Sequence, residues 1–214
     1  RGHTVTVYEK NQELGGRARQ FKTKGYTFDM GPSWYWMPDV FEKFFNRFNK
    51  KSSDYYELHQ LDPGFQIIFE KNKTMPIPAD WQSILNLFDE IESGSSQELE
   101  KFMNEAAYKY DFGINKLVYE PGLSIKEICK KELLINVFKL QVFTSYRKHI
   151  AKFFKHPNIK ALLEFPVLFL GTAPAETPAL YSLMAYSGIK HGTFYPSGGF
   201  GKVIDGFADL CKDL

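Results

Sequence analysis

Apolar and polar positions alternate near the start of the chain and recur at helical spacing soon after. The β-branched and aromatic run over 4–8 predicts a strand. Two short extended pieces follow near 19–22 and 26–29, joined by a Lys-Gly turn. Apolar residues at helical spacing then predict a helix over 39–48 that Pro38 opens.

The middle and end of the chain are predicted to be mostly helical. Helical periodicity runs from Ala79 to about Phe154, with breaks near 93–96 and 120–122. The pattern leaves the type of the apolar stretch 162–170 open. The other expected elements are strands over 55–61, 65–70 and 74–77, a helix over 179–187, a bridge over 188–194 and a final helix from Val203.

Composition limits the class of protein. With 214 residues and 43% hydrophobic content, the chain can bury a sizeable core in one or two domains. The aromatic share of 16% suits either a large aromatic core or a cavity for an apolar ligand. The formal net charge of +2 gives no nucleic-acid signal, and no nucleic-acid partner is expected.

Cysteine, histidine and apolar spacing point away from several other classes. The two cysteines imply no disulfide framework, which fits a reducing compartment. The five histidines show no metal-ligand spacing, so we expect no metal. No apolar run approaches the roughly 20 residues that span a bilayer, so we expect a soluble protein or one that lies on a membrane surface.

Both ends of the sequence are abrupt. The chain starts at Arg1 rather than Met, and Gly2 is typical of the glycine that ends a preceding helix. The predicted final helix stops at Leu214 without a cap. We therefore expect a fragment of a longer protein.

Glu9 ends the first predicted strand. An acid at the tip of the second strand of a dinucleotide fold accepts hydrogen bonds from the ribose hydroxyls, and the glycine fingerprint lies about 20 residues upstream. Only eight residues precede Glu9, so that fingerprint is expected outside this chain. The alternative is a solvated glutamate at a strand end.

Gly15, Gly16 and Arg17 follow Glu9 after a gap of five residues. Paired glycines let a backbone approach a ligand closely and adopt positive φ, and a guanidinium pairs well with a pyrophosphate. A glycine turn followed by an ordinary surface arginine is the alternative. The combination with an upstream acid is more specific than any single piece.

These motifs resemble the flavin amine oxidase and phytoene desaturase superfamily. Residues 5–10 (VTVYEK) and 14–18 (LGGRA) look like its FAD-binding opening, and 28–41, from FDMGPSW to MPDVF, is similar to bacterial-type phytoene desaturases. Residues 195–201 (YPSGGFG) resemble the family's YPxGGM segment, with Phe200 in place of Met. The resemblance covers the whole chain, but the middle carries little signature, and the C-terminal stretch that completes the family's flavin site is absent.

The resemblance implies roles for individual residues. Glu9 should bind the adenosine ribose, and Asp29 is as compatible with a loop-closing hydrogen bond as with a flavin contact. Gly198 and Gly199 should let their loop pass near the flavin or the substrate channel, although an ordinary tight turn is the alternative. The remaining residues expected to bind the cofactor are Gly15, Gly16, Arg17, Gly31, Pro32 and Ser33. No catalytic proton acceptor is identified.

A basic segment offers a possible membrane contact. Residues 126–155 hold eight Lys or Arg against two acids. Over 145–155, apolar residues share one helical face and lysines lie opposite, so the helix could rest on an anionic membrane. The alternative is a helix packed on the core with a solvated basic face.

The resemblance implies an α/β fold: a partial FAD-binding Rossmann-like domain over 1–48, a helix-rich α+β substrate domain with a small antiparallel sheet over 49–192, and a return segment over 193–214.

The implied activity is desaturation of a long polyene precursor by hydride transfer to FAD, with quinone or oxygen as terminal acceptor. The fragment alone is expected to be inactive. The implied location is cytoplasmic, on the inner face of the cell membrane. A polyene isomerase, a saturase, an amine oxidase or a non-catalytic lipid-binding remnant are the alternatives.

Overall fold

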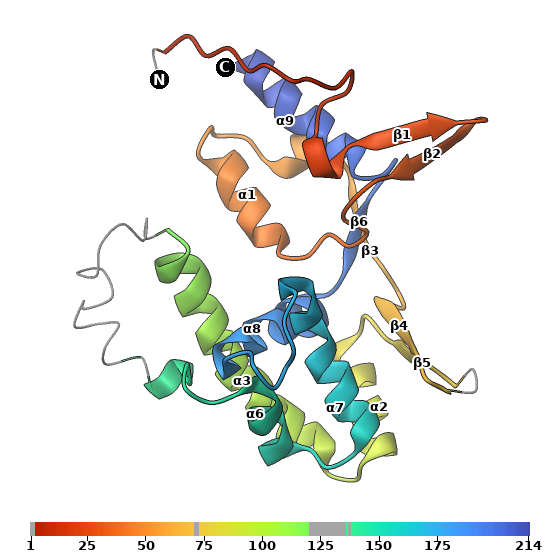
Figure 1. Ribbon diagram of the computed structural model, residues 1–214, viewed down its shortest axis with the longest axis vertical. Coiled ribbons are helices and arrows are strands. Elements are labelled where there is room, and N and C mark those ends of the chain that lie inside the picture. The colour runs from red at the N-terminus through yellow and green to blue at the C-terminus, as the bar shows by residue number, and fades with distance from the viewer. Residues whose placement is uncertain (1–2, 71–72, 120–135, 137) are drawn as a thin grey trace. The chain divides into compact units, whose positions relative to one another are not determined.

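The computed structural model describes residues 3–70, 73–119, 136 and 138–214. It is rich in helix and carries three two-stranded antiparallel sheets (Figure 1). The chain forms two compact units: unit 1 joins the residues up to Gln60 to Phe194–Leu214, and unit 2 is Leu61–Thr193. Residues 49–60, which the sequence analysis assigned to the substrate side, thus lie in unit 1. Gly2 and the break expected at 120–122 lie outside the described residues.

The predicted extended pieces form a hairpin in unit 1. Strands β1 (Gln20–Thr23) and β2 (Tyr26–Asp29) pair antiparallel. Lys24 and Gly25 turn the chain with φ of 49° and 82°, the left-handed conformation that a tight two-residue turn requires. Because side chains alternate, Gln20 and Asp29 share one face of the hairpin.

An aromatic core holds unit 1 together. Helix α1 (Pro38–Asn46) begins at the predicted proline, and α9 (Gly201–Asp213) ends the chain. The core residues are Tyr35, Phe45, Tyr56, Phe200, Val203 and Leu210. The remaining elements are the short helices η1 (Gly16–Ala18) and η2 (Ser52–Asp54) and the paired strands β3 (Leu58–Gln60) and β6 (Phe194–Pro196). The core therefore joins the early part of the chain to its last helix.

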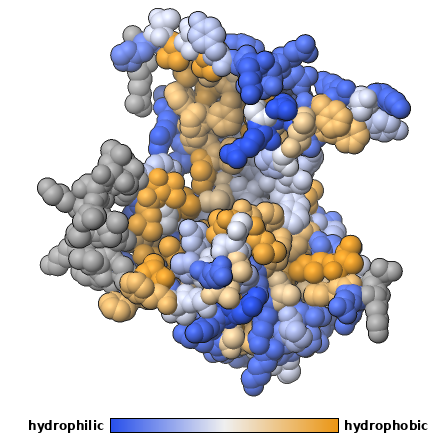
Figure 2. Space-filling view, viewed as in Figure 1, coloured by the Kyte–Doolittle hydropathy of each residue, from blue (hydrophilic) through white to orange (hydrophobic). Residues whose placement is uncertain are grey.

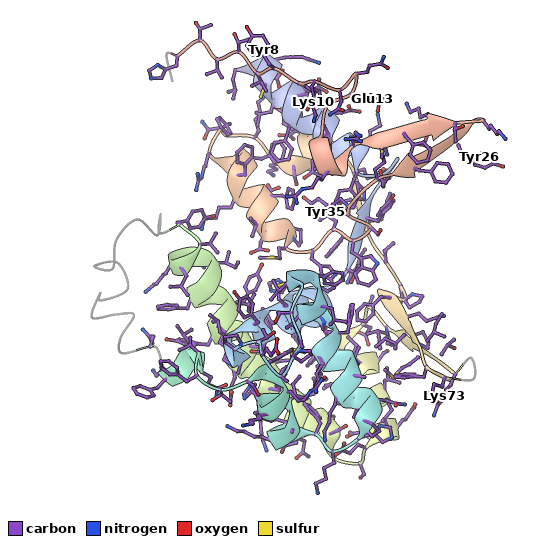
Figure 3. The ribbon with its side chains drawn as sticks, in the orientation of Figure 1. Tyr8, Lys10, Glu13, Tyr26, Tyr35 and Lys73 are labelled. Carbon is purple, nitrogen blue, oxygen red and sulfur yellow. The ribbon has the colours of Figure 1, made fainter. Side chains whose placement is uncertain are left out.

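The predicted strand over 4–8 is wrong. These residues form an irregular segment, along which Tyr8, Lys10 and Glu13 project (Figure 3). Val7 is 84% exposed and Tyr8 is 93% exposed. A strand needs a hydrogen-bonding partner, and no described segment pairs with this one. The described sheets are all antiparallel, so the Rossmann-like part of the expected fold stays a prediction.

Unit 2 is a helical body with one hairpin. Strands β4 (Phe65–Ile68) and β5 (Thr74–Ile77) pair antiparallel, and both match predicted strands. Asp80 caps the first helix by accepting the Ser83 N–H at 2.8 Å. The helices are α2 (Trp81–Ile91), α3 (Ser95–Phe112), η4 (Gly113–Leu117), α6 (Tyr146–Phe153), α7 (Pro157–Glu164), η5 (Phe165–Leu170), η6 (Ala179–Tyr181), α8 (Ser182–Ala185) and η7 (Tyr186–His191).

The apolar face of the basic helix is part of the core. Tyr146, Ile150 and Phe154 are each fully buried, and the Phe154 ring lies 5.8 Å from the Phe88 ring. The alternative of a helix packed on the core is confirmed for this face. The prediction that this face contacts a membrane is wrong, because other parts of the protein already cover it. Residues 126–135 of the basic segment lie outside the described part of the chain.

Apolar side chains also reach the surface of both units, as the orange patches in Figure 2 show. On the hairpin, Phe21 and Phe28 are 44% and 45% exposed and stack with their ring centroids 4.9 Å apart. In unit 2, Leu168 and Phe169 are each 58% exposed. In the described residues, no helix combines the length and apolar character that crossing a membrane requires.

Candidate functional site

The paired glycines begin a solvent-exposed turn in unit 1. Gly15 and Gly16 have φ of 106° and 54°, in the left-handed region that favours glycine. A Cβ on Gly16 would meet nothing within 4 Å, whereas one on Gly15 would lie 3.0 Å from Ile204 of α9. The turn is therefore anchored at its first glycine and open to a ligand at its second.

The loop with Gly31 lies directly against this turn. A Cβ on Gly31 would approach the Arg17 carbonyl oxygen to 1.9 Å, so no side chain fits there. The Met30 N–H donates to the Arg19 carbonyl at 3.0 Å and holds the two segments together. The structure thus brings together two segments that the sequence analysis singled out separately.

The Arg17 turn and the Gly31 loop share a face that is exposed to solvent. Gly16, Arg17, Gly31, Pro32 and Ser33 are all exposed. The Arg17 guanidinium forms no hydrogen bond or ion pair with any residue that the structure describes. An unpaired guanidinium beside unhindered backbone can receive a phosphate group in bidentate fashion.

Asp29 fastens the hairpin to the loop before α9. Its carboxylate accepts hydrogen bonds from Gln20 Nε2 at 2.7 Å, from the Tyr195 hydroxyl and from the Phe200 N–H at 3.1 Å. Partial burial alone would raise the pKa of Asp29, but these hydrogen bonds lower it below its ordinary value. The loop-closing bond expected for this aspartate is present, and its flavin contact stays a prediction.

Gly198 and Gly199 turn the chain next to this carboxylate. Their φ values are 81° and 85°, and a Cβ on Gly199 would lie 2.5 Å from Gln20 Nε2. Glycine is therefore required both for the turn and for close packing. A cleft of about 400 Å³ opens here, lined among others by Gln20, Lys22, Asp29, Gly199, Lys202 and Asp205.

Glu9 stands apart from these contacts. Its Oε1 accepts the Asn11 backbone N–H at 2.8 Å and Asn11 Nδ2 at 2.7 Å, and these bonds lower the pKa of the exposed carboxyl. Its segment is irregular instead of forming a strand tip. In the described chain, no hydrogen bond or ion pair joins Glu9 to the Arg17 turn.

Unit 2 contains a buried polar cluster that was not predicted from the sequence. Lys109 is fully buried, and its Nζ donates to Gln141 Oε1 at 2.9 Å, to the Ala179 carbonyl at 3.1 Å and to Ser182 Oγ at 3.1 Å. Burial lowers the pKa of Lys109 to about 8. The available signal was spacing: Lys109 lies seven residues after Phe102, on the apolar face of α3.

His149 lies beside this lysine. Its Nε2 is 3.5 Å from Lys109 Nζ and 3.5 Å from Glu105 Oε2. Burial, followed by the charges of Lys109 and Lys152, lowers the pKa of His149 to about 3, so its ring is neutral in the folded protein. Within the described ranges, no three His, Cys, Asp or Glu side chains are placed to bind a metal ion.

Comparison with known proteins gives the family. The whole chain, residues 1–214, matches the family described as flavin containing amine oxidoreductase. It is 36% identical over 214 residues to a carotenoid 3,4-desaturase of Haloarcula japonica, covering 43% of that protein. It is 30% identical over 213 residues to a 4,4'-diapophytoene desaturase (4,4'-diaponeurosporene-forming) of Staphylococcus aureus strain MRSA252, covering 42% of that protein. The chain thus spans about two fifths of the length of the curated relatives it matches.

These matches confirm the resemblance that the sequence motifs gave. The family match covers the same residues as the motifs, and Phe200, which stands where the family motif has Met, is buried in the unit 1 core. The chain belongs to the flavin-containing amine oxidoreductase family.

Proposed function

We propose that this chain forms the pyrophosphate-binding and substrate-side portion of an FAD-dependent oxidoreductase that desaturates a long, phytoene-type polyene. The family match over the whole chain and the names of its relatives support this proposal. The structural observation that carries it is the exposed Gly16–Arg17 turn with an unpaired guanidinium.

The described residues fit an adenine-linked flavin. Arg17 would pair with the pyrophosphate, and the open face of Gly16 would let the backbone approach it. Gly31, Pro32 and Ser33 would line the neighbouring wall. Glu9 has an Oε2 without a described hydrogen-bond donor, and it would accept from the ribose hydroxyls after a movement of its irregular segment.

The flavin would supply the acceptor for hydrogen removed from a saturated carbon pair, and quinone or oxygen would reoxidise it. The protein's own part is to position and to exclude water. Asp29 holds the Gly198–Gly199 turn in place, which would fix one wall of the substrate channel. We also propose that the enzyme works at the cytoplasmic face of the cell membrane, since its lipophilic substrate would be dissolved in that membrane.

Flavin retention tests the proposal. The chain is mixed with FAD, passed through a desalting column and examined for flavin absorbance. The wild-type chain should retain FAD, and Arg17→Ala should weaken its affinity at least tenfold, about 1.4 kcal/mol, because one charged phosphate contact is lost. Lys212→Ala, an exposed change on α9, is the matched control.

Three results would count against the proposal. A wild-type chain that retains no FAD would favour the non-catalytic alternative for the chain as it stands. Equal affinity of the wild type and Arg17→Ala would remove the turn from the cofactor site. With flavin bound, reduction by an amine but not by a polyene would assign amine oxidation instead.

A further inference from the structure

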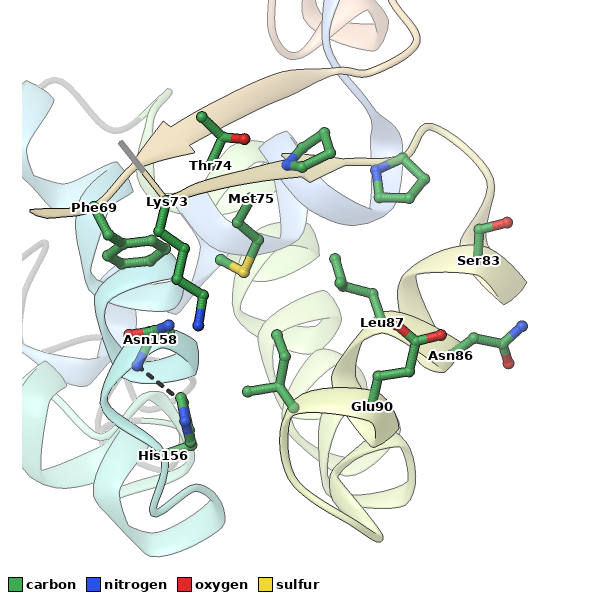
Figure 4. A pocket seen from close by; sticks show the side chains of 13 residues that line it. Phe69, Lys73, Thr74, Met75, Ser83, Asn86, Leu87, Glu90, His156 and Asn158 are labelled. Atoms are coloured by element: carbon green, nitrogen blue, oxygen red, sulfur yellow. Dashed lines mark hydrogen bonds between the residues drawn. The ribbon is translucent and has the colours of Figure 1, made fainter. Parts of the chain in front are cut away.

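A second cleft lies wholly within unit 2. It has a volume of about 670 Å³ and opens between the β4–β5 hairpin, helix α2 and the start of α7 (Figure 4). This size falls within the roughly 300–1,000 Å³ of typical small-molecule sites. None of its residues belongs to the glycine turns of unit 1, so it is a site distinct from those turns.

One wall of the cleft presents hydrogen-bond donors. Lys73 points into the cleft from the hairpin, and His156 and Asn158 lie beside it at the start of α7 (Figure 4). The Lys73 carbonyl accepts the Phe69 N–H at 2.8 Å, which fixes its backbone. Its ammonium has no ion pair or hydrogen bond with a described residue.

His156 adds a donor to the same wall. Its Nδ1 accepts the Asn158 N–H at 3.2 Å, so the neutral ring carries its proton on Nε2. The His156 N–H donates to Glu92 Oε2 at 2.7 Å, which holds the start of α7 in place. An anionic group can therefore meet an ammonium, an imidazole N–H and an amide on one wall.

The α2 wall has the opposite character. Glu90 lines the cleft from α2 and forms no ion pair with a described residue (Figure 4). Asn86 of the same helix also lines it, with its Oδ1 accepting Gln82 Nε2 at 3.1 Å. Met75, Leu87 and Ile91 add apolar surface between the two walls. The cleft thus separates an unpaired positive charge from an unpaired negative charge across an apolar floor.

We infer that this cleft binds the phosphoethanolamine headgroup of a zwitterionic lipid, with the phosphate at Lys73 and the ammonium at Glu90. A primary ammonium can donate three hydrogen bonds, and the unpaired Glu90 carboxylate on the α2 wall accepts from it. The apolar floor receives the first carbons of the lipid. A ligand with one charge would leave the opposite wall unpaired.

Calorimetric titration with single-chain lipids below their micelle concentrations tests this assignment. The wild-type chain should bind lysophosphatidylethanolamine at least tenfold more tightly than lysophosphatidylglycerol, which lacks the ammonium. The wild-type chain should also bind lysophosphatidylethanolamine more tightly than phosphoethanolamine, which lacks the apolar chain. Glu90→Gln should remove the preference between the two lysolipids, and Lys73→Gln should weaken both about tenfold.

The controls use a lysine and a glutamate elsewhere in unit 2. Lys101 and Glu98 pair on α3 and do not line the cleft, so Lys101→Gln and Glu98→Gln should change nothing. Lys73 and Glu90 are exposed, and circular dichroism checks that their variants fold. The inference would be overturned if the wild type bound both lysolipids equally. It would also be overturned if Glu90→Gln kept the wild-type preference for lysophosphatidylethanolamine. Phosphoethanolamine binding as tightly as the lysolipid would overturn its lipid part. None of these results bears on flavin retention.

Discussion

The polar groups around Asp29 and those of the unit 2 cleft differ in how far they are satisfied. The Asp29 carboxylate already accepts bonds from a side-chain amide, a hydroxyl and a backbone N–H. Lys73 and Glu90 face their cleft without a partner in the described protein. Satisfied groups hold a structure together, whereas unsatisfied groups are available to a ligand. By this criterion Arg17 belongs with the second set.

The largest effect on stability is expected at Gly31. In Gly31→Ala the new Cβ would lie 1.9 Å from the Arg17 carbonyl oxygen and would overlap it. The two backbone segments must separate, at a cost of about 3 kcal/mol. Urea unfolding measures this loss. Gly16→Ala is the matched control, because nothing lies within 4 Å of its Cβ, and it should cost about 1 kcal/mol for its positive φ.

An intermediate effect is expected at Asp29. Asp29→Asn removes the charge and one acceptor from the bonds to Tyr195 and Phe200, and should cost about 1–2 kcal/mol in urea unfolding. The carboxylate is only partly buried, which keeps the cost moderate. Asp205→Asn, in the same cleft but on the exposed face of α9, should cost less than about 0.5 kcal/mol. Equal losses for both variants would mean that Asp29 does not hold the loop.

An effect of similar size that depends on pH is expected from His149. Its folded pKa of about 3 lies below the ordinary 6.5, so only the unfolded chain binds this proton between those values. Stability is therefore complete above pH 6.5 and falls as the pH drops, by about 2 kcal/mol at pH 5. Denaturant unfolding at pH 7 and pH 5 measures the difference. His149→Gln should show a clearly smaller difference, and an unchanged one would contradict the assignment.

Local patterns were enough to predict the elements that local chemistry determines. The Lys24–Gly25 turn between two extended pieces gives the hairpin, and Pro38 opens α1 as expected. The strand over 4–8 failed because a strand also depends on a partner, which residue type does not specify. The sequence pattern therefore does not distinguish an extended segment that finds a partner strand, such as the hairpin, from one that does not, such as 4–8.

The candidate site was predictable in residue type but not in arrangement. Gly15, Gly16 and Arg17 were singled out by their spacing after Glu9, yet the packing of Gly31 on the Arg17 carbonyl is a long-range contact. The burial of Lys109 depends on residues from three other helical segments and on Gln141. A single chain pattern does not reveal such distant partners.

The most direct test of the distinction between satisfied and unsatisfied groups measures two quantities on two variants. Arg17→Ala and Asp29→Asn are each examined for FAD affinity and for the free energy of unfolding. The account predicts that Arg17→Ala lowers FAD affinity at least tenfold, about 1.4 kcal/mol, and leaves unfolding without FAD unchanged, while Asp29→Asn lowers the unfolding free energy. An Arg17→Ala chain that loses stability but binds FAD as tightly as the wild type would contradict it.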